Sequence, residues 1–302
     1  MADLAAPFPY FGGKRRAAPL VWRALGDPSG YVEPFAGSAA VLLARPDFDG
    51  RRVETLNDAD GWLVNTWRAI QHNPHAVAQH AYGPVSEIDY HARLAWLQER
   101  RSDGLPAWLE GDPEAHDAKA AGWWLYVVAC GIGDPFGSGP WRVVDGRLTD
   151  TRELPHLGDA GRGDYDRLVG YMRALADRLR RVRITCGDWR RVVQPSVYRA
   201  GSGGDGARAI FLDPPYSTSG DLYVHGDSQV AHAVREWCAG APNHLRIVLC
   251  GYDDEHDSLG WRRINGSAGG GAGYSANGLN GRRERLWLSP GCLDIAEQGV
   301  LL

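Results

Sequence analysis

The sequence predicts an α/β protein built on a doubly wound sheet, and three of its features carry this prediction. Short apolar runs of strand length recur along the chain, and several end in an acidic residue or a glycine-containing turn. Segments with helical periodicity separate these runs, as connections between parallel strands require. The alternation stops at residue 73 and resumes near residue 165, so we expect a domain inserted into the sheet domain. A length of 302 residues suffices for one large domain or about two ordinary ones.

A turn with paired glycines comes first, at Tyr10-Phe11-Gly12-Gly13-Lys14. Paired glycines let a backbone pass close to a neighbouring segment, so the turn can deliver Lys14 to a fixed point. Lys14 and Lys119 are the only lysines in a chain whose other basic side chains are arginines. A lysine in such a chain indicates that position 14 uses the compact charge of the ammonium group. The alternative is that the segment is an ordinary glycine turn without a functional role.

The first predicted strand, 31–33, leads through a small-residue turn into a helix predicted over 39–44. The turn is Glu33-Pro34-Phe35-Ala36-Gly37-Ser38. A strand, a turn of small residues and a helix bind adenosine-type ligands at the first crossover of a doubly wound sheet. Because the GxGxxG spacing is absent, this is not the fingerprint of a nicotinamide site.

A second predicted strand, 53–56, ends in Asn57-Asp58, about 25 residues after Glu33. That spacing is typical of a carboxylate that binds the ribose of an adenosine-type ligand. Asp58 could instead cap the helix predicted over 61–70. The nearby small-residue turn favours the ligand role.

Residues 73–164 break the alternation of strands and helices. Helices are predicted over 86–101 and 114–130, and the aromatic stripe of the second is more typical of a core than of a contact surface. Residues 131–142 are too rich in glycine and proline for a regular element, and long loops of this kind are often functional. We interpret the block as a mainly helical domain whose role differs from that of the sheet.

The alternation resumes with an amphipathic helix whose apolar stripe is formed by Tyr165, Leu168, Met172, Leu175 and Leu179. A strand over 183–186 then leads to Gly187-Asp188-Trp189. Further apolar strands are predicted over 209–212, 245–250 and 285–289.

The strand predicted over 209–212 ends in Asp213-Pro214-Pro215-Tyr216. An acid at the carboxyl end of a buried strand lies where open α/β sheets bind ligands, and two prolines direct the backbone out of the sheet. Asp213 and the Pro214 carbonyl could each accept one N–H of a nucleobase amine, while Tyr216 stacks on the base. Such contacts suit methylation of an exocyclic amine, whose lone pair is delocalised into the ring. The alternative is an ordinary strand end, with Asp213 as a cap and the prolines as a breaker.

Composition excludes several classes of protein. Hydrophobic residues make up 44% of the chain and charged residues 23%, as in soluble globular proteins. The five cysteines show no CxxC spacing and no nearby histidine cluster, so we predict no metal site and no disulfide framework. No apolar stretch is long enough to span a bilayer, and we expect a cytoplasmic protein without a membrane partner. With a net charge of −4, any nucleic acid must bind a local basic face.

Five motifs, in their order and spacing, resemble those of the Dam-like DNA adenine-N6 methyltransferases. They are Tyr10-Phe11-Gly12-Gly13-Lys14, Glu33-Pro34-Phe35-Ala36-Gly37-Ser38, Asn57-Asp58 with Leu63-Val64-Asn65 behind it, Gly187-Asp188-Trp189, and Asp213-Pro214-Pro215-Tyr216. The resemblance implies a Rossmann-like methyltransferase domain over residues 1–72 and 165–302, with a target-recognition domain inserted over 73–164. It also implies a bacterial or phage-encoded protein, for which we expect a monomer and a restriction endonuclease as a possible partner.

The resemblance implies S-adenosyl-L-methionine as methyl donor, no metal, and a target adenine flipped out of double-stranded DNA. The donor-binding residues it implies are Tyr10, Gly12, Gly13, Lys14, Glu33, Pro34, Phe35, Ala36, Gly37, Ser38, Asp58, Asp188, Trp189 and Asp213. Tyr10 and Lys14 would border the methionine end of the donor, and Asp58 would bind its ribose. Asp188 and Trp189 would contact its adenine ring. The tetrapeptide Asp213 to Tyr216 would hold the target base as the catalytic motif. Ala39 stands where the family commonly has glycine.

Three other functions remain open. A cytosine-N4 methyltransferase uses similar chemistry, but more often has serine at the position of Asp213. A catalytically inactive DNA-binding relative would keep the fold, although the intact tetrapeptide argues against it. A glutamine methylase acting on proteins usually has asparagine in place of Asp213, so it ranks last.

Overall fold

The computed structural model describes residues 4–8, 14–46, 52–84, 86–101, 104–130, 143–144, 147–148, 165–198, 205–215, 228–265 and 283–295. The chain divides into two compact units. The sheet unit consists of residues 11–59 and 188–302, and the helical unit of residues 1–10 and 60–187.

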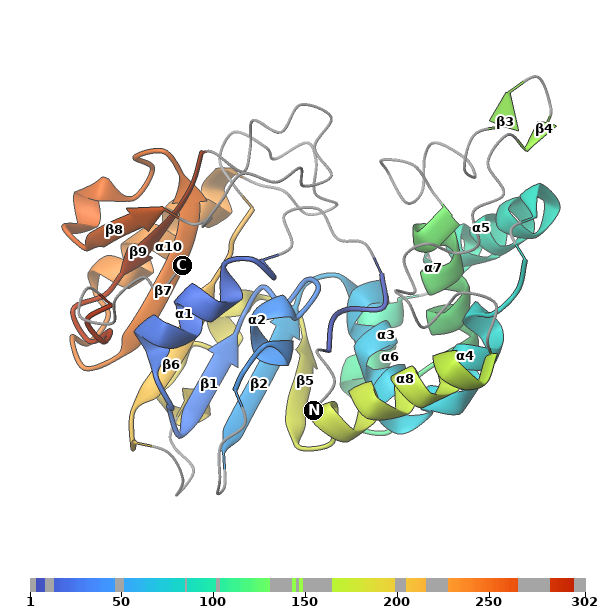
Figure 1. The fold of residues 1–302 in the computed structure, drawn as a ribbon, viewed down its shortest axis with the longest axis horizontal. Helices are drawn as coiled ribbons and strands as arrows, with labels where there is room; N and C mark the ends of the chain where they lie inside the picture. The colour runs from blue at the N-terminus through green and yellow to red at the C-terminus, as the bar shows by residue number, and fades with distance from the viewer. Residues whose placement is uncertain are drawn as a thin grey trace. The chain divides into compact units, whose positions relative to one another are not determined.

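Within the described residues, the long strands form a seven-stranded sheet of order β5-β2-β1-β6-β7-β9-β8 (Figure 1). Their bounds are β1 (Gly30–Glu33), β2 (Val53–Asp58), β5 (Val182–Cys186), β6 (Arg208–Leu212), β7 (Arg246–Tyr252), β8 (Arg262–Asn265) and β9 (Glu284–Leu288). β1 pairs in parallel with β2 and with β6, and β6 pairs in parallel with β7. β9 runs antiparallel to both β7 and β8. The predicted α/β class is confirmed, as a mixed fold with a mostly parallel sheet that is consistent with a methyltransferase.

The sheet unit buries both faces of its central strands, because successive side chains along a strand point to opposite sides. Its helical elements are α1 (Ala18–Leu25), α2 (Ala40–Leu43), the 3-10 turns η2 (Trp189–Arg191) and η4 (Asp257–Leu259), α9 (Pro195–Tyr198) and α10 (Ser228–Ala239). Tyr31 of β1 contacts Trp22 of α1, and the Trp22 indole donates a hydrogen bond to the Val41 carbonyl at 2.7 Å. Figure 1 shows α1 and α2 on the near side of the strands. Val32 belongs instead to a second apolar cluster, together with Trp189 and Val234.

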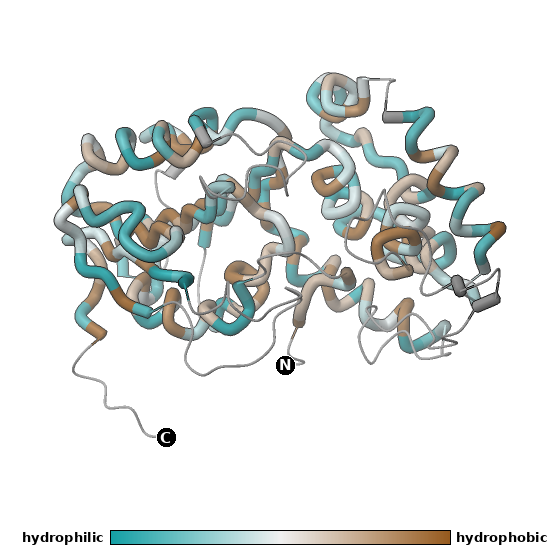
Figure 2. Tube along the Cα trace, turned by 90° about the horizontal axis from the view of Figure 1, so that it is seen from above, coloured by the Kyte–Doolittle hydropathy of each residue, from teal (hydrophilic) through white to brown (hydrophobic). Residues whose placement is uncertain are grey.

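The helical unit contains α3 (Gly61–His72), α4 (Pro74–Ala81), α5 (Glu87–Arg101), α6 (Leu105–Gly111), α7 (Ala118–Cys130), α8 (Tyr165–Leu179), the short hairpin β3 (Val143–Val144) and β4 (Arg147–Leu148), and the edge strand β5. Brown and teal segments alternate along its helices in Figure 2, as expected for helices with one apolar face. The predicted stripe of α8 is confirmed at Leu168, Met172, Leu175 and Leu179, which are all fully buried. Helix α7 is buried over nearly its whole length, so it is the central helix of this unit.

Gly122 allows α7 to pack closely against α4. A β-carbon at this position would lie 2.4 Å from the His80 β-carbon and 2.8 Å from the Val77 carbonyl oxygen. Both distances are shorter than a van der Waals contact, so a side chain at position 122 would push the two helices apart.

One helix start and one helix cap differ from the sequence analysis. The helix predicted from residue 114 begins at Ala118, because the Asp117 side chain accepts a hydrogen bond from the Ala120 N–H at 2.8 Å. Helix α3 is capped by Asp60, whose side chain accepts from the Trp62 N–H at 2.9 Å. The alternative role of Asp58 as the cap of this helix is therefore wrong.

In the part of the chain that the structure describes, no helix combines the length and hydrophobicity that a bilayer crossing requires.

Candidate functional site

The parallel strands of the sheet unit carry acidic side chains to one edge. Glu33 ends β1, Asp58 ends β2, and Asp213 follows the last residue of β6. Because these strands run in the same direction, their carboxyl ends meet at the edge where open α/β sheets bind ligands. The candidate site lies at this edge.

An ion-paired cluster forms around Lys14. Its ammonium lies 2.9 Å from the Asp213 carboxylate and 3.2 Å from the Glu284 carboxylate, and the Lys14 side chain is only 4% exposed. The Lys14 carbonyl accepts a hydrogen bond from the Ala18 N–H at 2.9 Å, so the first turn of α1 fixes the position of the lysine backbone. Lys14 is therefore placed between β6 and β9, directly against the predicted catalytic acid.

Glu33 is a buried acid at the end of β1. Its carboxylate accepts hydrogen bonds from the Tyr31 hydroxyl at 3.0 Å and from the Leu42 N–H at 3.2 Å. Burial raises the pKa of Glu33 from 4.5 to about 8, against the lowering effect of these two bonds, and the charge of Asp213 raises it further. Glu33 is accordingly protonated in much of the population at neutral pH.

The small-residue turn and the end of β2 are joined by hydrogen bonds. The Ala36 N–H donates to the Asn57 carbonyl at 2.8 Å, and the Gly37 N–H donates to the Asp58 carboxylate at 2.9 Å. The Asn57 amide donates to the Pro34 carbonyl at 3.0 Å. Gly37 has a φ of 46°, in the left-handed region that glycine adopts without strain. Asp58 therefore lies directly beside the turn, and its role in ligand binding stays a prediction.

Asp188 and Trp189 occupy different environments. Asp188 caps η2 by accepting from the Arg190 N–H at 2.8 Å, and its carboxylate also pairs with the Arg190 side chain at 3.1 Å. Trp189 is 5% exposed and packs against Phe35 at 6.0 Å and Trp237 at 6.2 Å between ring centroids. Phe35 and Trp189 are thus brought together in one apolar cluster, and their contact with a donor stays a prediction.

Three residues of the site were not singled out by the sequence. Glu284 opens β9 and is paired with Tyr252 at the end of β7. Burial and then the charge of Glu284 raise the pKa of Tyr252 to about 12. The Cys250 thiol is fully buried and donates a hydrogen bond to Asp213; burial above all raises its pKa well above the ordinary value. These residues are brought to the site by the pairing of β7 with β9, which places the start of β9 beside the end of β7. A prediction of that pairing would have been needed to find them from the sequence.

Pro214 is buried and Pro215 is half-buried, next to Asp213. Tyr10, Gly12, Gly13 and Tyr216 lie outside the described residues. Among the side chains that the structure describes, no group of three or more histidine, cysteine, aspartate or glutamate residues is arranged to hold a metal ion.

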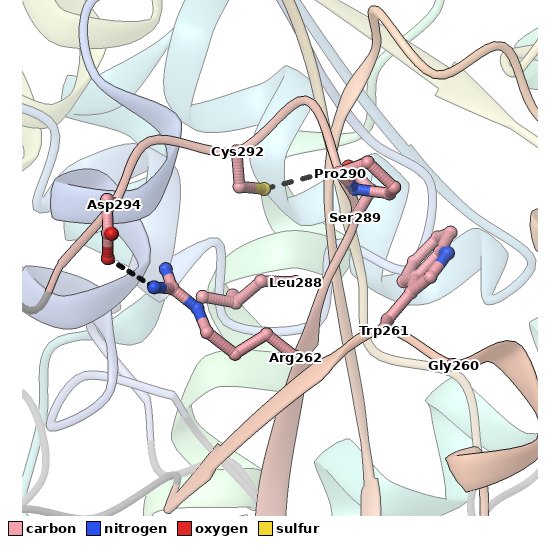
Figure 3. Close-up of a pocket in the computed structure, with 8 residues that line it drawn as sticks. All are labelled: Gly260, Trp261, Arg262, Leu288, Ser289, Pro290, Cys292 and Asp294. Atoms are coloured by element: carbon pink, nitrogen blue, oxygen red, sulfur yellow. Dashed lines mark hydrogen bonds and ion pairs between the residues drawn. The ribbon is translucent and has the colours of Figure 1, made fainter.

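A shallow hollow of about 300 Å³ lies elsewhere on the sheet unit (Figure 3). Its lining residues are Gly260, Trp261, Arg262, Leu288, Ser289, Pro290, Cys292 and Asp294. Figure 3 shows Arg262 turned toward Asp294, with which it forms an ion pair. The hollow adjoins Leu288, the last residue of β9, whereas the Lys14 cluster adjoins Glu284, the first residue. It is therefore separate from the candidate site.

A mixed α/β fold with a mostly parallel sheet is consistent with a methyltransferase, and the acids of this chain lie at the carboxyl ends of the strands, where such sheets bind ligands. Residues 10–92 match the family model described as D12 class N6 adenine-specific DNA methyltransferase. The match covers the first three of the five motifs and confirms the resemblance found from them. It supports DNA methyltransferase activity at the N6 position of adenine. No protein among the curated proteins matches the chain.

Proposed function

We propose that this protein transfers a methyl group from S-adenosyl-L-methionine to N6 of an adenine flipped out of double-stranded DNA. The observation that carries the proposal is the contact between Lys14 and Asp213, 2.9 Å apart. Lys14 lies within the segment that matches the adenine methyltransferase family, whereas Asp213 opens the tetrapeptide far outside it. Two motifs that the family resemblance identifies independently therefore meet at one point.

The donor set at this edge suits S-adenosyl-L-methionine. Asp58 beside the Gly37 N–H supplies a carboxylate for the ribose hydroxyl groups. The carboxylates of Asp213 and Glu284 give the edge a negative character that favours a cationic donor. Phe35 and Trp189 supply aromatic surface for an adenine ring. When bound, the donor supplies a methyl group on a positively charged sulfur, whose bond to carbon breaks as the bond to N6 forms.

The role of Asp213 is electrostatic. Its carboxylate accepts an N–H of the target amine, which turns the nitrogen lone pair out of the plane of the base. It also stabilises the positive charge that grows on the nitrogen during transfer. The extra proton on the methylated nitrogen then leaves to solvent. The Pro214 carbonyl accepts the second N–H, and Tyr216 stacks on the base.

Base flipping is part of the proposal because N6 of a stacked adenine is out of reach of a carboxylate on the protein. Residues 73–164, which break the sheet pattern, select the DNA site. Since the net charge is −4, the phosphate contacts come from local arginines, and DNA binding weakens strongly with added salt.

Replacing Asp213 by Asn tests the catalytic role. The variant keeps the size of the side chain but loses its charge, and we expect methyl transfer to slow by about 10²–10³-fold while donor affinity changes little. Asp58→Ala should show the opposite pattern, with weaker donor binding by about 1.5–3 kcal/mol. Single-turnover transfer and calorimetric titration of the donor measure the two effects in the same preparations.

Product analysis by nucleoside mass spectrometry decides between the competing functions. N6-methyladenine in mixed-sequence DNA supports the proposal, and N4-methylcytosine would replace it by the cytosine reaction. DNA binding without any methyl transfer would identify an inactive DNA-binding relative. An Asp213→Asn variant that transfers methyl groups at the parent rate would show that the tetrapeptide is only a strand end.

A further inference from the structure

Strand β9 brings a second acid to the lysine of the candidate site. Glu284 lies outside the segment that matches the family model, and it opens β9 opposite Tyr252 of β7. Its carboxylate is 3.2 Å from the Lys14 ammonium, which is also 2.9 Å from Asp213. The two carboxylates are each 20% exposed, so both act in a partly desolvated environment.

The balance of charge in this cluster bears on the reaction. One ammonium is shared between two carboxylates, so Lys14 offsets less of the Asp213 charge than it would if it contacted Asp213 without Glu284. The target amine gains positive charge during transfer, so it is stabilised by a carboxylate whose charge has not been fully offset. A lysine drawn partly toward Glu284 holds Asp213 in place and offsets less of its charge.

We propose that Glu284 is a positioning residue for methyl transfer, which holds the Lys14 ammonium between itself and Asp213 so that Asp213 keeps negative charge for the target amine. This inference rests on the proposed function. Glu284 acts through Lys14 and touches neither base nor donor in this role.

Two neighbouring titratable side chains, Tyr252 and Cys250, add no charge to the cluster at neutral pH. Burial raises the pKa values of Tyr252 and Cys250, and the carboxylates of Glu284 and Asp213 raise them further. Both side chains therefore stay protonated and neutral at neutral pH. Neither side chain therefore changes how Lys14 is shared between the two carboxylates.

Glu284→Gln is the informative variant, because the amide keeps the shape of the side chain but removes its charge. We expect single-turnover methyl transfer to fall by about 10- to 100-fold, with donor affinity within about twofold of the parent. Glu284→Asp should recover part of the rate. Glu236→Gln is the matched control, because Glu236 is an exposed acid on α10 that pairs with His232, and it should keep the parent rate.

The same substitution in a Lys14→Met background tests whether Glu284 acts through the lysine. If it does, Glu284→Gln causes no further loss of rate in that background.

A loss of the same size in both backgrounds, or a parent rate in Glu284→Gln alone, would overturn the inference while leaving the proposed function intact. Loss of donor binding and of folding in both Glu284→Gln and Glu284→Asp would reduce Glu284 to a structural role. A parent protein that transfers no methyl group to DNA would refute both proposals.

Discussion

Ala39 holds a backbone conformation that alanine adopts only at a cost. Its φ of 49° and ψ of 29° lie in the left-handed region, and it forms the N-cap of α2. A β-carbon in this region is crowded by the neighbouring carbonyl, which costs roughly 1–2 kcal/mol. The turn tolerates this strain because Ala36 and Gly37 on its other side are bonded to the end of β2.

Ala39→Gly should therefore stabilise the protein by up to about 1 kcal/mol, since glycine adopts this conformation freely. Ala40→Gly is the control: the next residue is helical, and glycine there should destabilise by about 0.5–1 kcal/mol. Thermal unfolding of the two variants beside the parent measures both signs. Equal losses of stability in the two variants would contradict the strain at position 39.

Helices α4 and α7 approach each other at a residue without a side chain. A methyl group added at Gly122 would collide with His80 and Val77, so the facing helix already fills the space beside this glycine. Helix α8 contains a second glycine, Gly170, which is exposed and has no neighbour within 4 Å of its β position. Substitution of Gly170 therefore tests helix propensity alone, whereas substitution of Gly122 also tests the packing of α4 against α7.

Gly122→Ala should destabilise the protein by about 1–3 kcal/mol, because the added methyl group overpacks the interface of α4 and α7. Gly170→Ala should stabilise it by about 0.5–1 kcal/mol, because alanine is the better helix former and meets open space. Thermal unfolding detects the opposite shifts. Two shifts of the same sign would mean that the α4 and α7 contact is looser than the structure shows.

At the scale of the whole molecule, Glu33 links folding to pH. Its pKa rises from 4.5 in an exposed chain to about 8 in the folded protein, chiefly through burial. At a pH between 4.5 and about 8, the Glu33 carboxyl group holds a proton in the folded protein and has released it in the unfolded chain. The contribution of Glu33 to the free energy of unfolding therefore falls as pH rises, by up to about 1.4 kcal/mol per pH unit.

Glu33→Gln should remove this contribution, because glutamine stays neutral at every pH. We expect the stability of the parent relative to the variant to decline steadily from about pH 5 to about pH 8. Melting temperatures of both proteins across that range, without donor, measure the decline. Groups such as His256, whose pKa is lowered by burial, act alike in both proteins and cancel from the difference. Parallel curves for the two proteins would show that Glu33 is ionised when folded.

Much of the sheet could be predicted from the sequence alone. The apolar runs that became β2, β6, β7 and β9 are short and end at acids, glycines or polar residues, so local hydrophobicity was enough to locate them. The motif residues Glu33, Asp58 and Asp213 follow directly, because each sits at the end of such a run. Helices α4 and α6 were not predicted, since 8 and 7 residues give too few turns for a clear periodicity.

What only the tertiary structure decided is which of these residues touch. The pairing of Lys14 with Asp213 and Glu284 joins three segments far apart in the chain. It depends on the parallel pairing of β6 with β7 and on the antiparallel entry of β9 beside β7. Local patterns of hydrophobicity report whether a run is buried, but not its neighbours or its direction. The sequence by itself therefore determined the strands, the motifs and their resemblance to a family, whereas the contacts around Asp213 arose from the order and direction of the strands.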